Sequence, residues 1–501
     1  MLVLAVACVL IISVIWSLKL LYKIWWRPKT IEKELKKQGI HGYPYRLLFG
    51  NTKEKIKPAK ESESMHDIMP RVNPLLHKLA TTYKKVFVVW VGIIPRVSIM
   101  DPKLIKEIML NKSGDFPQLE GNSFTKLFAT GLASYDGDKW AIHRKILNPA
   151  FHIEKLKQML PAFSTCSEEL IERWEKLVSS GGSSEVDVSQ EFLNLTGDVI
   201  SRVAFGTNFE QGRLVCLLLK EQGTLFLRSY LNMIFPILRF LPTQVNKRMR
   251  QIHGEVGALL RVIIENRQRS IQAGNDEKDD LLSLLLKSNQ QTSDDRLTID
   301  DVIEECKLFY FAGQETTATL LTWSMILLSM HQNWQERARK EVLQILRKNK
   351  PTFDDLNHLK IVNMILLEVL RLYPPTAPSK RTIKKTKLGN MYLRAGVHLS
   401  IPLLIVHRDP ELWGEDALEF NPERFAQGIT NASKDEISYF PFGWGPRKCI
   451  GQNFALLEAK LALSQILQYF SFELSPTYTH APCSGISLQP KYGAQIILRK
   501  L

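Results

Sequence analysis

The stretch that decides the fold lies near the C-terminal end of the chain, at residues 442–451, and reads FGWGPRKCIG. Its glycines and its proline predict a turn-rich loop. The residues that follow, 452–469, are apolar at helical spacing and contain no proline, so we expect a helix to begin just after Cys449. Unpaired backbone N–H groups and the helix dipole at that position favour a thiolate over a thiol. A thiolate held in this way acts either as a nucleophile or as a metal ligand.

The metal-ligand interpretation explains more of the residues around Cys449. A nucleophilic cysteine needs an adjacent base, and no histidine lies near Cys449 in the sequence, although a partner from elsewhere in the fold stays open. A flat cofactor can approach the backbone closely at Gly445 and Gly451, which have no side chains. Arg447 can donate hydrogen bonds to an anionic edge of that cofactor, and Phe442 can cover one of its faces. A buried structural cysteine is the remaining alternative.

This stretch matches every fixed position of the haem-binding signature of the cytochrome P-450 superfamily, Phe-x-x-Gly-x-Arg-x-Cys-x-Gly. By this resemblance, Cys449 is the axial ligand of the iron in haem b, and Arg447, Phe442 and Gly451 bind the cofactor. The resemblance also implies a mainly α fold with small β-sheets. In that fold the haem lies between a long central oxygen-binding helix and the cysteine loop with its helix.

Composition limits the other classes of protein. The 501 residues could form more than one domain, yet no long Pro-, Gly- or Ser-rich linker divides them, so we expect one large catalytic domain. Six scattered cysteines do not suggest a disulfide framework and favour a reducing, cytosolic environment. The net charge of +15 is spread along the chain without a base-reading motif, which argues against nucleic acid. A membrane surface, an acidic protein partner or a merely solvated basic surface accounts for it.

The N-terminal segment predicts a membrane anchor. Residues 1–18 carry no charged side chain, and Trp25, Trp26 and several basic residues follow them, as is typical of a span and its interface. A cleaved signal peptide is the alternative, but no basic n-region or small-residue cleavage site is evident. Because the positive charges follow the span, we expect the rest of the chain on the cytosolic side. The predicted division is a transmembrane anchor (1–26), a basic linker and hinge (27–50) and a haem-thiolate catalytic domain (51–501).

Residues 299–330 contain no proline and predict one long central helix. In its middle lies the stretch 312–317, AGQETT. A glycine inside a helix costs about 0.5 to 1 kcal/mol relative to alanine, so Gly313 suggests a close approach to the backbone, and a hydroxyl there can bond back to the preceding turn. An ordinary polar patch is the alternative. The stretch resembles the oxygen motif of the family, which implies that Thr316 orients dioxygen, Glu315 relays protons, and Ala312 and Gly313 adjoin the cofactor.

Three further residues are predicted to bind the cofactor. Trp140 and Arg144 lie four residues apart, on one face of a predicted helix. They resemble the Trp-x-x-x-Arg pair of the family, whose donors bind a haem propionate; the alternative is surface packing. The same resemblance makes Arg381 a third propionate contact.

Two charged motifs are assigned a structural role. Glu368 and Arg371 lie three residues apart on a predicted helix, and Arg424 belongs to a Pro-Glu-Arg-Phe stretch downstream. Both stretches resemble family motifs that meet in a buried network, which we expect to hold the loop that carries Cys449. Removing one partner would leave an unpaired buried charge.

The remaining expectations concern smaller elements and the substrate. The β-branched runs 86–91 and 97–100 predict a hairpin separated by Gly92 and Pro95, and 155–290 predicts amphipathic helices broken near residues 181–182 and 236–242. Ser379 and Lys380 are more polar than expected, which favours an oxygenated or acidic substrate unless the lysine points to solvent. The predicted substrate-pocket residues are Leu119, Phe124, Phe128, Phe309, Ala377, Pro378, Ser379 and Ile486.

Finer similarity points to a plant microsomal clan. The stretches 301–307 (DVIEECK) and 472–476 (FELSP), together with Trp444, resemble the clan that includes secologanin synthase and triterpenoid and gibberellin oxidases. That resemblance implies a reductase-dependent haem-thiolate monooxygenase, located in the endoplasmic reticulum membrane as a single-pass protein. It would insert one oxygen atom from O2 into a C–H bond of a small hydrophobic terpenoid-derived substrate of iridoid, triterpenoid, sterol or gibberellin type, in one or several oxidations.

The expected partners follow from the same resemblance. NADPH-cytochrome P-450 reductase would deliver electrons, so that NADPH is used indirectly, with cytochrome b5 as a second candidate and membrane lipid around the anchor. Two alternatives stay open at this point. One is a haem-thiolate isomerase or lyase that works without reductase, and the other is a membrane-tethered haem protein that binds a ligand without catalysis.

Overall fold

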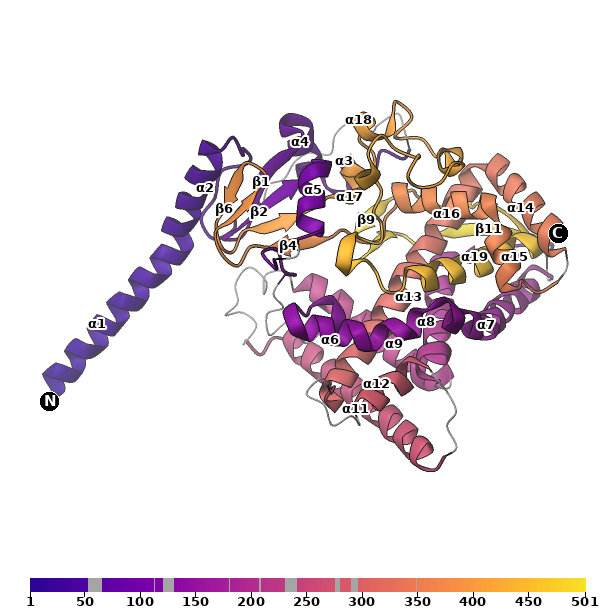
Figure 1. Ribbon diagram of the computed structural model, residues 1–501, viewed down its shortest axis with the longest axis horizontal. Coiled ribbons are helices and arrows are strands. Elements are labelled where there is room, and N and C mark those ends of the chain that lie inside the picture. The colour runs from indigo at the N-terminus through magenta and orange to yellow at the C-terminus, as the bar shows by residue number, and fades with distance from the viewer. Residues whose placement is uncertain are drawn as a thin grey trace.

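The protein consists of a helical body that carries small β-sheets and one long N-terminal helix that projects from it (Figure 1). Helices predominate in the part of the chain that the structure describes, so the predicted fold class, mainly α with small sheets, is confirmed. The computed structural model describes residues 1–52, 65–111, 113–119, 130–179, 181–206, 209–229, 241–274, 280–289, 296–347 and 349–501.

The helices and strands have the following bounds. The helices are α1 (Leu2–Leu21), α2 (Arg27–Lys37), α3 (Met69–Val72), α4 (Pro74–Tyr83), α5 (Pro102–Met109), α6 (Gly137–Leu147), α7 (Ile153–Ser179), α8 (Val188–Phe205), α9 (Phe209–Arg228), α11 (Gln244–Gln272), α12 (Leu281–Asn289), α13 (Ile299–Met330), α14 (Gln332–Leu346), α15 (Phe353–His358), α16 (Lys360–Leu372), α17 (Leu403–Val406), α18 (Pro410–Trp413) and α19 (Gln452–Tyr469). The strands are β1 (Val86–Val91), β2 (Ile94–Ile99), β3 (Ser183–Asp187), β4 (Ser379–Arg381), β5 (Thr386–Leu388), β6 (Met391–Leu393), β7 (His398–Ser400), β8 (Phe470–Leu474), β9 (Pro482–Ser484), β10 (Leu488–Pro490) and β11 (Gln495–Lys500).

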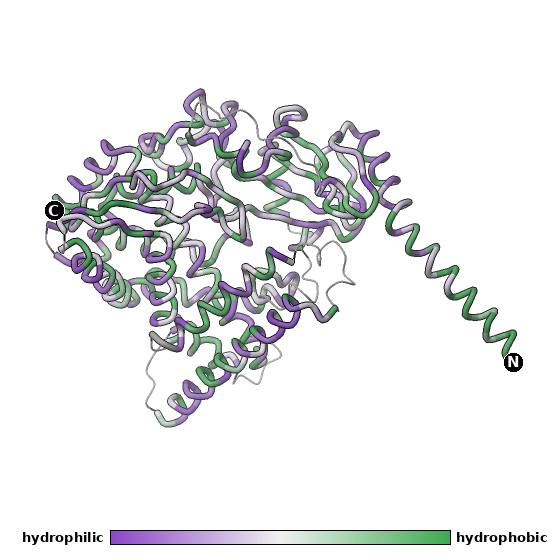
Figure 2. Tube along the Cα trace, turned by 180° about the vertical axis from the view of Figure 1, so that it is seen from behind, coloured by the Kyte–Doolittle hydropathy of each residue, from purple (hydrophilic) through white to green (hydrophobic). Residues whose placement is uncertain are grey.

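The N-terminal helix α1 has the length and composition of a membrane span. None of its residues is buried, and Figure 2 shows mostly hydrophobic residues along it. Through a π-helical turn, Tyr22–Trp26, it continues into α2 as one helix. A helix this apolar that packs against no protein is consistent with membrane anchoring.

The first part of the predicted linker is itself helical and packs on the body. Ile31 and Leu35 of α2 are buried, and Arg27 Nη2 donates a hydrogen bond of 2.8 Å to the carbonyl oxygen of Ala395. The helix therefore runs through the predicted boundary at residue 26 and docks beyond it.

The four-stranded sheet has the order β1-β2-β7-β4. The predicted hairpin is present, because β1 and β2 pair antiparallel. The prediction that Pro95 belongs to the turn is wrong, since Pro95 pairs with Trp90 inside the ladder. Proline fits there because the pairing of β2 with β7 begins only at Arg96, so no ladder bond to β7 is lost at Pro95.

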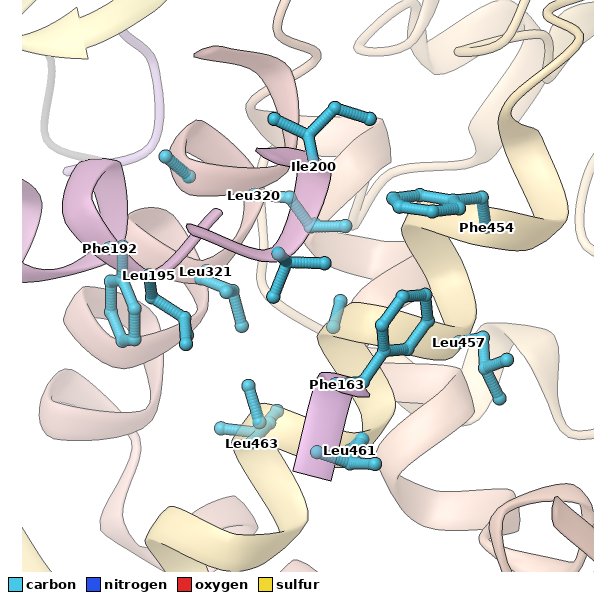
Figure 3. Packing of buried hydrophobic residues seen from close by; sticks show 14 of the residues in the cluster. Phe163, Phe192, Leu195, Ile200, Leu320, Leu321, Phe454, Leu457, Leu461 and Leu463 are labelled. Atoms are coloured by element: carbon cyan, nitrogen blue, oxygen red, sulfur yellow. The ribbon is translucent and has the colours of Figure 1, made fainter. Parts of the chain in front are cut away.

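The central helix α13 has the predicted bounds and crosses the middle of the body (Figure 1). It packs against α8, while α19 packs against α7. Figure 3 shows the resulting core, in which Leu320 and Leu321 of α13 lie near residues of α8 and Phe163 of α7 faces Phe454 of α19. The rings of Phe163 and Phe454 meet edge to face with centroids 5.0 Å apart.

The region after α6 is largely helical as predicted. The break near residue 181 is confirmed, and it leads into the short strand β3, which the sequence did not indicate. The predicted break at 236–242 falls mostly outside the described residues, and α11 begins at Gln244.

Candidate functional site

The cysteine loop is closed by its own backbone. The N–H of Cys449 donates a hydrogen bond of 2.8 Å to the carbonyl oxygen of Phe442, and Gly443 and Gly445 adopt positive φ angles of 72° and 70°. A Cβ atom on Gly445 would lie 2.6 Å from the carbonyl oxygen of Met109. The end of α5 therefore approaches the backbone closely at Gly445. A Cβ atom on Gly451 would lie 3.9 Å from the ring of Phe151, which is an ordinary van der Waals distance.

Two residues separate Cys449 from Gln452, the first residue of α19 (Gln452–Tyr469), so this helix has the predicted bounds. The Cys449 side chain is accessible, yet protein surrounds it closely enough that burial raises the pKa of its thiol. The Gly451 amide and the charges of Arg144 and Lys448 lower that pKa in opposition. The loop thus supplies donors and cations that favour a sulfur anion.

Trp140, Arg144 and Arg447 are brought together beside the loop. The guanidinium carbon of Arg447 lies 4.5 Å from the centre of the Trp140 ring, and Arg144 Nη1 donates to the carbonyl oxygen of Lys448 at 3.0 Å. Burial lowers the pKa of both arginines, as expected for cations held away from water.

Arg447 provides a test of whether a carboxylate-bearing cofactor fits. Its Nη2 pairs with Asp136 at 2.7 Å, but its Nη1 is buried and has no hydrogen-bond partner among the described residues. Leaving a charged donor unpaired is costly, and a carboxylate at this position would satisfy it. The residues present therefore fit the propionate edge of a haem.

Lys380 also belongs near this group, which sequence reasoning missed. Only 6% of the residue is exposed, so the alternative that it points to solvent is wrong. Burial, and then repulsion from Arg447, lower the pKa of Lys380 to about 8. Successive side chains of a strand face opposite sides, so Lys380 points away from the side of Ser379 and Arg381. Arg381 donates from Nε to the carbonyl oxygen of Gln118 at 3.0 Å.

The oxygen motif lies in α13 as predicted. Thr316 Oγ1 donates to the carbonyl oxygen of Ala312 at 2.7 Å, the bond expected for a hydroxyl at that spacing. A Cβ on Gly313 would lie 3.0 Å from Cδ1 of Ile200. The group that approaches Gly313 is thus a side chain of α8.

Glu315 is held by residues from the C-terminal end of the chain. Its Oε1 accepts hydrogen bonds from Ser487 Oγ at 2.6 Å and from Gln489 Nε2. Burial raises the pKa of Glu315, and the bond from Ser487 lowers it in part. No sequence signal could have found Ser487 and Gln489, because they are remote from α13 along the chain.

The predicted charge network is assembled and buried. Arg371 Nε and Nη2 each donate to Glu368 at 2.7 Å, and neither side chain is exposed. Arg424 Nε lies 3.7 Å from Glu368 Oε1, and Arg424 Nη2 pairs at 2.7 Å with Asp416, which the sequence did not indicate. The network joins α16 to the segment that leads into the cysteine loop.

The predicted pocket residues separate into different places. Ala377, Ser379 and Ile486 line a common cavity. Phe309 is instead buried and stacks on Phe151, with ring centroids 5.5 Å apart. Leu119 and Pro378 do not line this cavity. Leu119 is half-buried, and the carbonyl oxygen of Pro378 accepts a hydrogen bond from the N–H of Ile401. Phe124 and Phe128 lie outside the described residues.

Comparison with known proteins decides the family. The sequence pattern of the cytochrome P-450 family matches residues 65–497. The chain belongs to the cytochrome P-450 family. This P-450 is similar along its whole length to cytochrome P-450 CYP72A616 of Paris polyphylla, with 51% identity over 99% of each chain.

Two further relatives carry names that state a reaction. Secologanin synthase 1 of Catharanthus roseus is 47% identical over 97% of this chain and 95% of its own. The 11-oxo-beta-amyrin 30-oxidase of Glycyrrhiza uralensis is 49% identical over 97% and 96%. The protein is thus a P-450 monooxygenase of the clan that includes these enzymes; its cofactor is haem, and its class implies a reductase partner.

Proposed function

We propose that this P-450 oxidises a terpenoid-derived substrate at the endoplasmic reticulum membrane, with Cys449 as the axial ligand of its haem. The observation that carries the proposal is the cysteine loop, where an accessible thiol lies two residues after Arg447, whose Nη1 has no hydrogen-bond partner among the described residues. An iron ligand and a propionate donor are the two contacts that a haem needs most.

Arg447, Trp140 and Arg144 would hold the propionates, and the cation of Lys380 would add to the attraction for them. The Gly451 amide and the charge of Arg144 would stabilise the Cys449 sulfur as an anion. When bound there, the haem supplies the activation of dioxygen, which no protein side chain can perform. The remaining task of the chain is to position substrate, exclude water and deliver protons.

Proton delivery is assigned to Glu315 and Thr316. Burial raises the pKa of Glu315, which favours the protonated form of its carboxyl relative to that of an exposed glutamate. Since Oε1 accepts the hydrogen bonds from Ser487 and Gln489, a proton held by this carboxyl would lie on Oε2 and pass from there toward the Thr316 hydroxyl. Thr316 donates its own proton to the Ala312 carbonyl oxygen, so its oxygen lone pairs are available as acceptors.

The substrate class rests on the relatives. The names secologanin synthase and 11-oxo-beta-amyrin 30-oxidase support an iridoid or triterpenoid substrate for this chain, with sterols and gibberellins as the wider panel. Electrons would come from NADPH-cytochrome P-450 reductase, with cytochrome b5 as a second donor. The exposed Lys448 on the cysteine loop supports docking of an acidic partner on that face.

Substitution of the cysteine tests the proposal. We expect Cys449→His to abolish the thiolate-type carbon monoxide spectrum of the reduced protein and all oxidation of a terpenoid panel in reductase-bearing microsomes. The matched control is Cys483→Ser, a half-buried cysteine in β9. A thiolate-type spectrum in Cys449→His would show that another residue ligates the iron.

A second substitution tests the proton path. We expect Thr316→Ala to consume NADPH at a similar rate but to release more of the oxygen as hydrogen peroxide and less as oxidised substrate. Coupling of NADPH use to product that matches the wild type would remove Thr316 from this step.

A further inference from the structure

A cavity of about 310 Å³ lies between the four-stranded sheet and the connection from β9 to β10. The predicted pocket residues Ala377, Ser379 and Ile486 belong to its lining, and helices α3 and α4 close another side. All of its lining residues lie in the described part of the chain. This cavity is distinct from the cysteine loop, none of whose residues line it.

One face of the sheet forms the floor of the cavity. Arg96 of β2, Ser400 of β7 and Ser379 of β4 all line it. In the register of the sheet, Ser400 pairs with Ser379, while Arg96 and Arg381 both pair with His398 in the adjacent row. Residues two apart in a strand share a face, so a row of hydroxyls lies beside a row of basic side chains.

The charge of this lining has one sign. Arg96 is the only ionisable side chain among the described residues that line the cavity, and none of them is acidic. Burial, and then repulsion from Arg96 and Arg381, lower the pKa of His398 to about 4, so its imidazole is neutral at pH 7. The positive charge at the floor therefore comes from the guanidinium group of Arg96, which suits a planar carboxylate.

The opposite walls are mainly apolar, although Asn73 and Ser487 also line them. Met69, Val72 and Leu76 line the cavity from α3 and α4, and Ile486 lines it from the connection between β9 and β10. A site of this kind suits a molecule with an apolar body and one charged or oxygenated end, because the apolar side chains of the walls contact the body while the floor pairs the polar end.

The cavity also adjoins the proposed proton path. Ser487 lines it and donates to Glu315 of α13, and Thr319 Oγ1 donates to Ser487 Oγ at 3.1 Å. The position of this segment is fixed, since Trp323 Nε1 donates to the carbonyl oxygen of Leu488 at 2.7 Å. A molecule in the cavity would lie one side chain away from the oxygen motif.

We infer that this cavity binds the carboxylate end of an apolar substrate, and that Arg96 is the residue that recognises the carboxylate. The inference rests on the proposed function and narrows its substrate class to terpenoids that carry an acid group. The sequence favoured an acidic substrate because of Ser379 and Lys380. Only Ser379 lines the cavity, since Lys380 faces the other side of the sheet, and Arg96 supplies the positive charge instead.

The test compares a pentacyclic triterpenoid carboxylic acid with its methyl ester. The dissociation constant of each is measured from the spectral shift of the haem in the full-length protein, for wild type, Arg96→Gln, Arg96→Lys and the control Arg499→Gln. Arg499 is an exposed strand arginine that pairs with Glu473 in another sheet. The carbon monoxide spectrum of each variant establishes that its haem site is intact, and Arg96→Lys keeps the charge should Arg96→Gln fold poorly.

We expect the wild type to bind the acid more tightly than the ester. Arg96→Gln should weaken binding of the acid about tenfold and leave the ester unchanged, since a hydrogen bond to a charged group is lost. The dissociation constant of the acid for Arg96→Lys should lie between those of the wild type and Arg96→Gln, and that for Arg499→Gln should match the wild type. Equal effects of Arg96→Gln on acid and ester, or none on either, would overturn the inference while the monooxygenase assignment stands. Failure of the wild type to bind either compound would overturn it together with the terpenoid class.

Discussion

The cysteine loop and the oxygen motif of α13 are positioned by different interactions. Glu368, Arg371 and Arg424 hold the segment before the loop through paired buried charges, and the loop itself is fixed by backbone contact between Gly445 and Met109. The oxygen motif is positioned by the packing of α13 against α8, and its Glu315 is held by hydrogen bonds from the neutral side chains of Ser487 and Gln489.

The difference matches what each region has to do. An axial ligand must remain at one place, and charge pairs with fixed geometry achieve this because any displacement leaves a charge unpaired. The proton path proposed for Glu315 would have to rearrange, and hydrogen bonds from neutral donors such as Ser487 and Gln489 can break without leaving a charged partner unpaired. The comparison leads to four predictions, in order of decreasing effect.

Arg371→Lys is expected to have the largest effect. Arg371 makes five hydrogen bonds, two to Glu368 and three to backbone carbonyl oxygens. The single ammonium group of lysine cannot replace the three donor nitrogens of the guanidinium group. We therefore expect a loss of about 3 to 5 kcal/mol in the free energy of unfolding. The measurement is the thermal unfolding of the haem-loaded protein and its haem content. Arg337→Lys, in an exposed pair with Glu423, should cost at most about 1 kcal/mol, and equal losses in both variants would contradict the comparison.

Gly445→Ala separates steric contact from backbone strain in the loop. Gly443 and Gly445 have similar positive φ angles, but only at Gly445 would a Cβ meet the Met109 carbonyl oxygen. We expect Gly445→Ala to cost about 2 to 3 kcal/mol and Gly443→Ala only about 1 kcal/mol. Thermal unfolding of the two variants provides the measurement. A larger cost at Gly443 would show that the contact with α5 does not fix the loop.

Gly313→Val tests the packing that positions the oxygen motif. The added side chain would overlap with Ile200, which should destabilise the protein by about 1 to 3 kcal/mol. Combined with Ile200→Ala, the same change should cost less, because the smaller side chain provides the space. Unfolding of the two single variants and the double variant measures this coupling. Additive losses would mean that Gly313 is required by something other than Ile200.

Asp198→Asn should have the smallest effect at acidic pH, and an effect that grows as the pH rises. Asp198 is a buried residue of α8, and burial raises the pKa of its carboxyl to about 7. Between its ordinary pKa of 3.8 and 7 the folded state binds more protons than the unfolded state, so the stability that this group provides falls as the pH rises through that window. Asparagine removes the dependence. We therefore expect a higher unfolding temperature than wild type at pH 8 and little difference at pH 4.5; a difference that is equal at both would exclude Asp198 as the cause.

Local sequence patterns were sufficient for elements whose bounds depend on their own residues. The absence of proline and the helical spacing predicted α13 and α19 with the bounds that they have. The pattern failed for Pro95, because its place in β2 depends on where the neighbouring strand β7 begins to pair. The helical start of the predicted linker also depends on more than local pattern, since α2 continues the helix of the anchor and docks on the body.

The sequence alone determined the family, the haem-binding cysteine motif and the residue types of the oxygen motif, because these depend on chemistry within short stretches. Only the tertiary structure decided which group approaches Gly313, which residues hold Glu315, and that Ser379 and Lys380 face opposite sides of a sheet. Such contacts join segments that are far apart along the chain. They are fixed by how the helices and the sheet pack, and no local pattern records that packing.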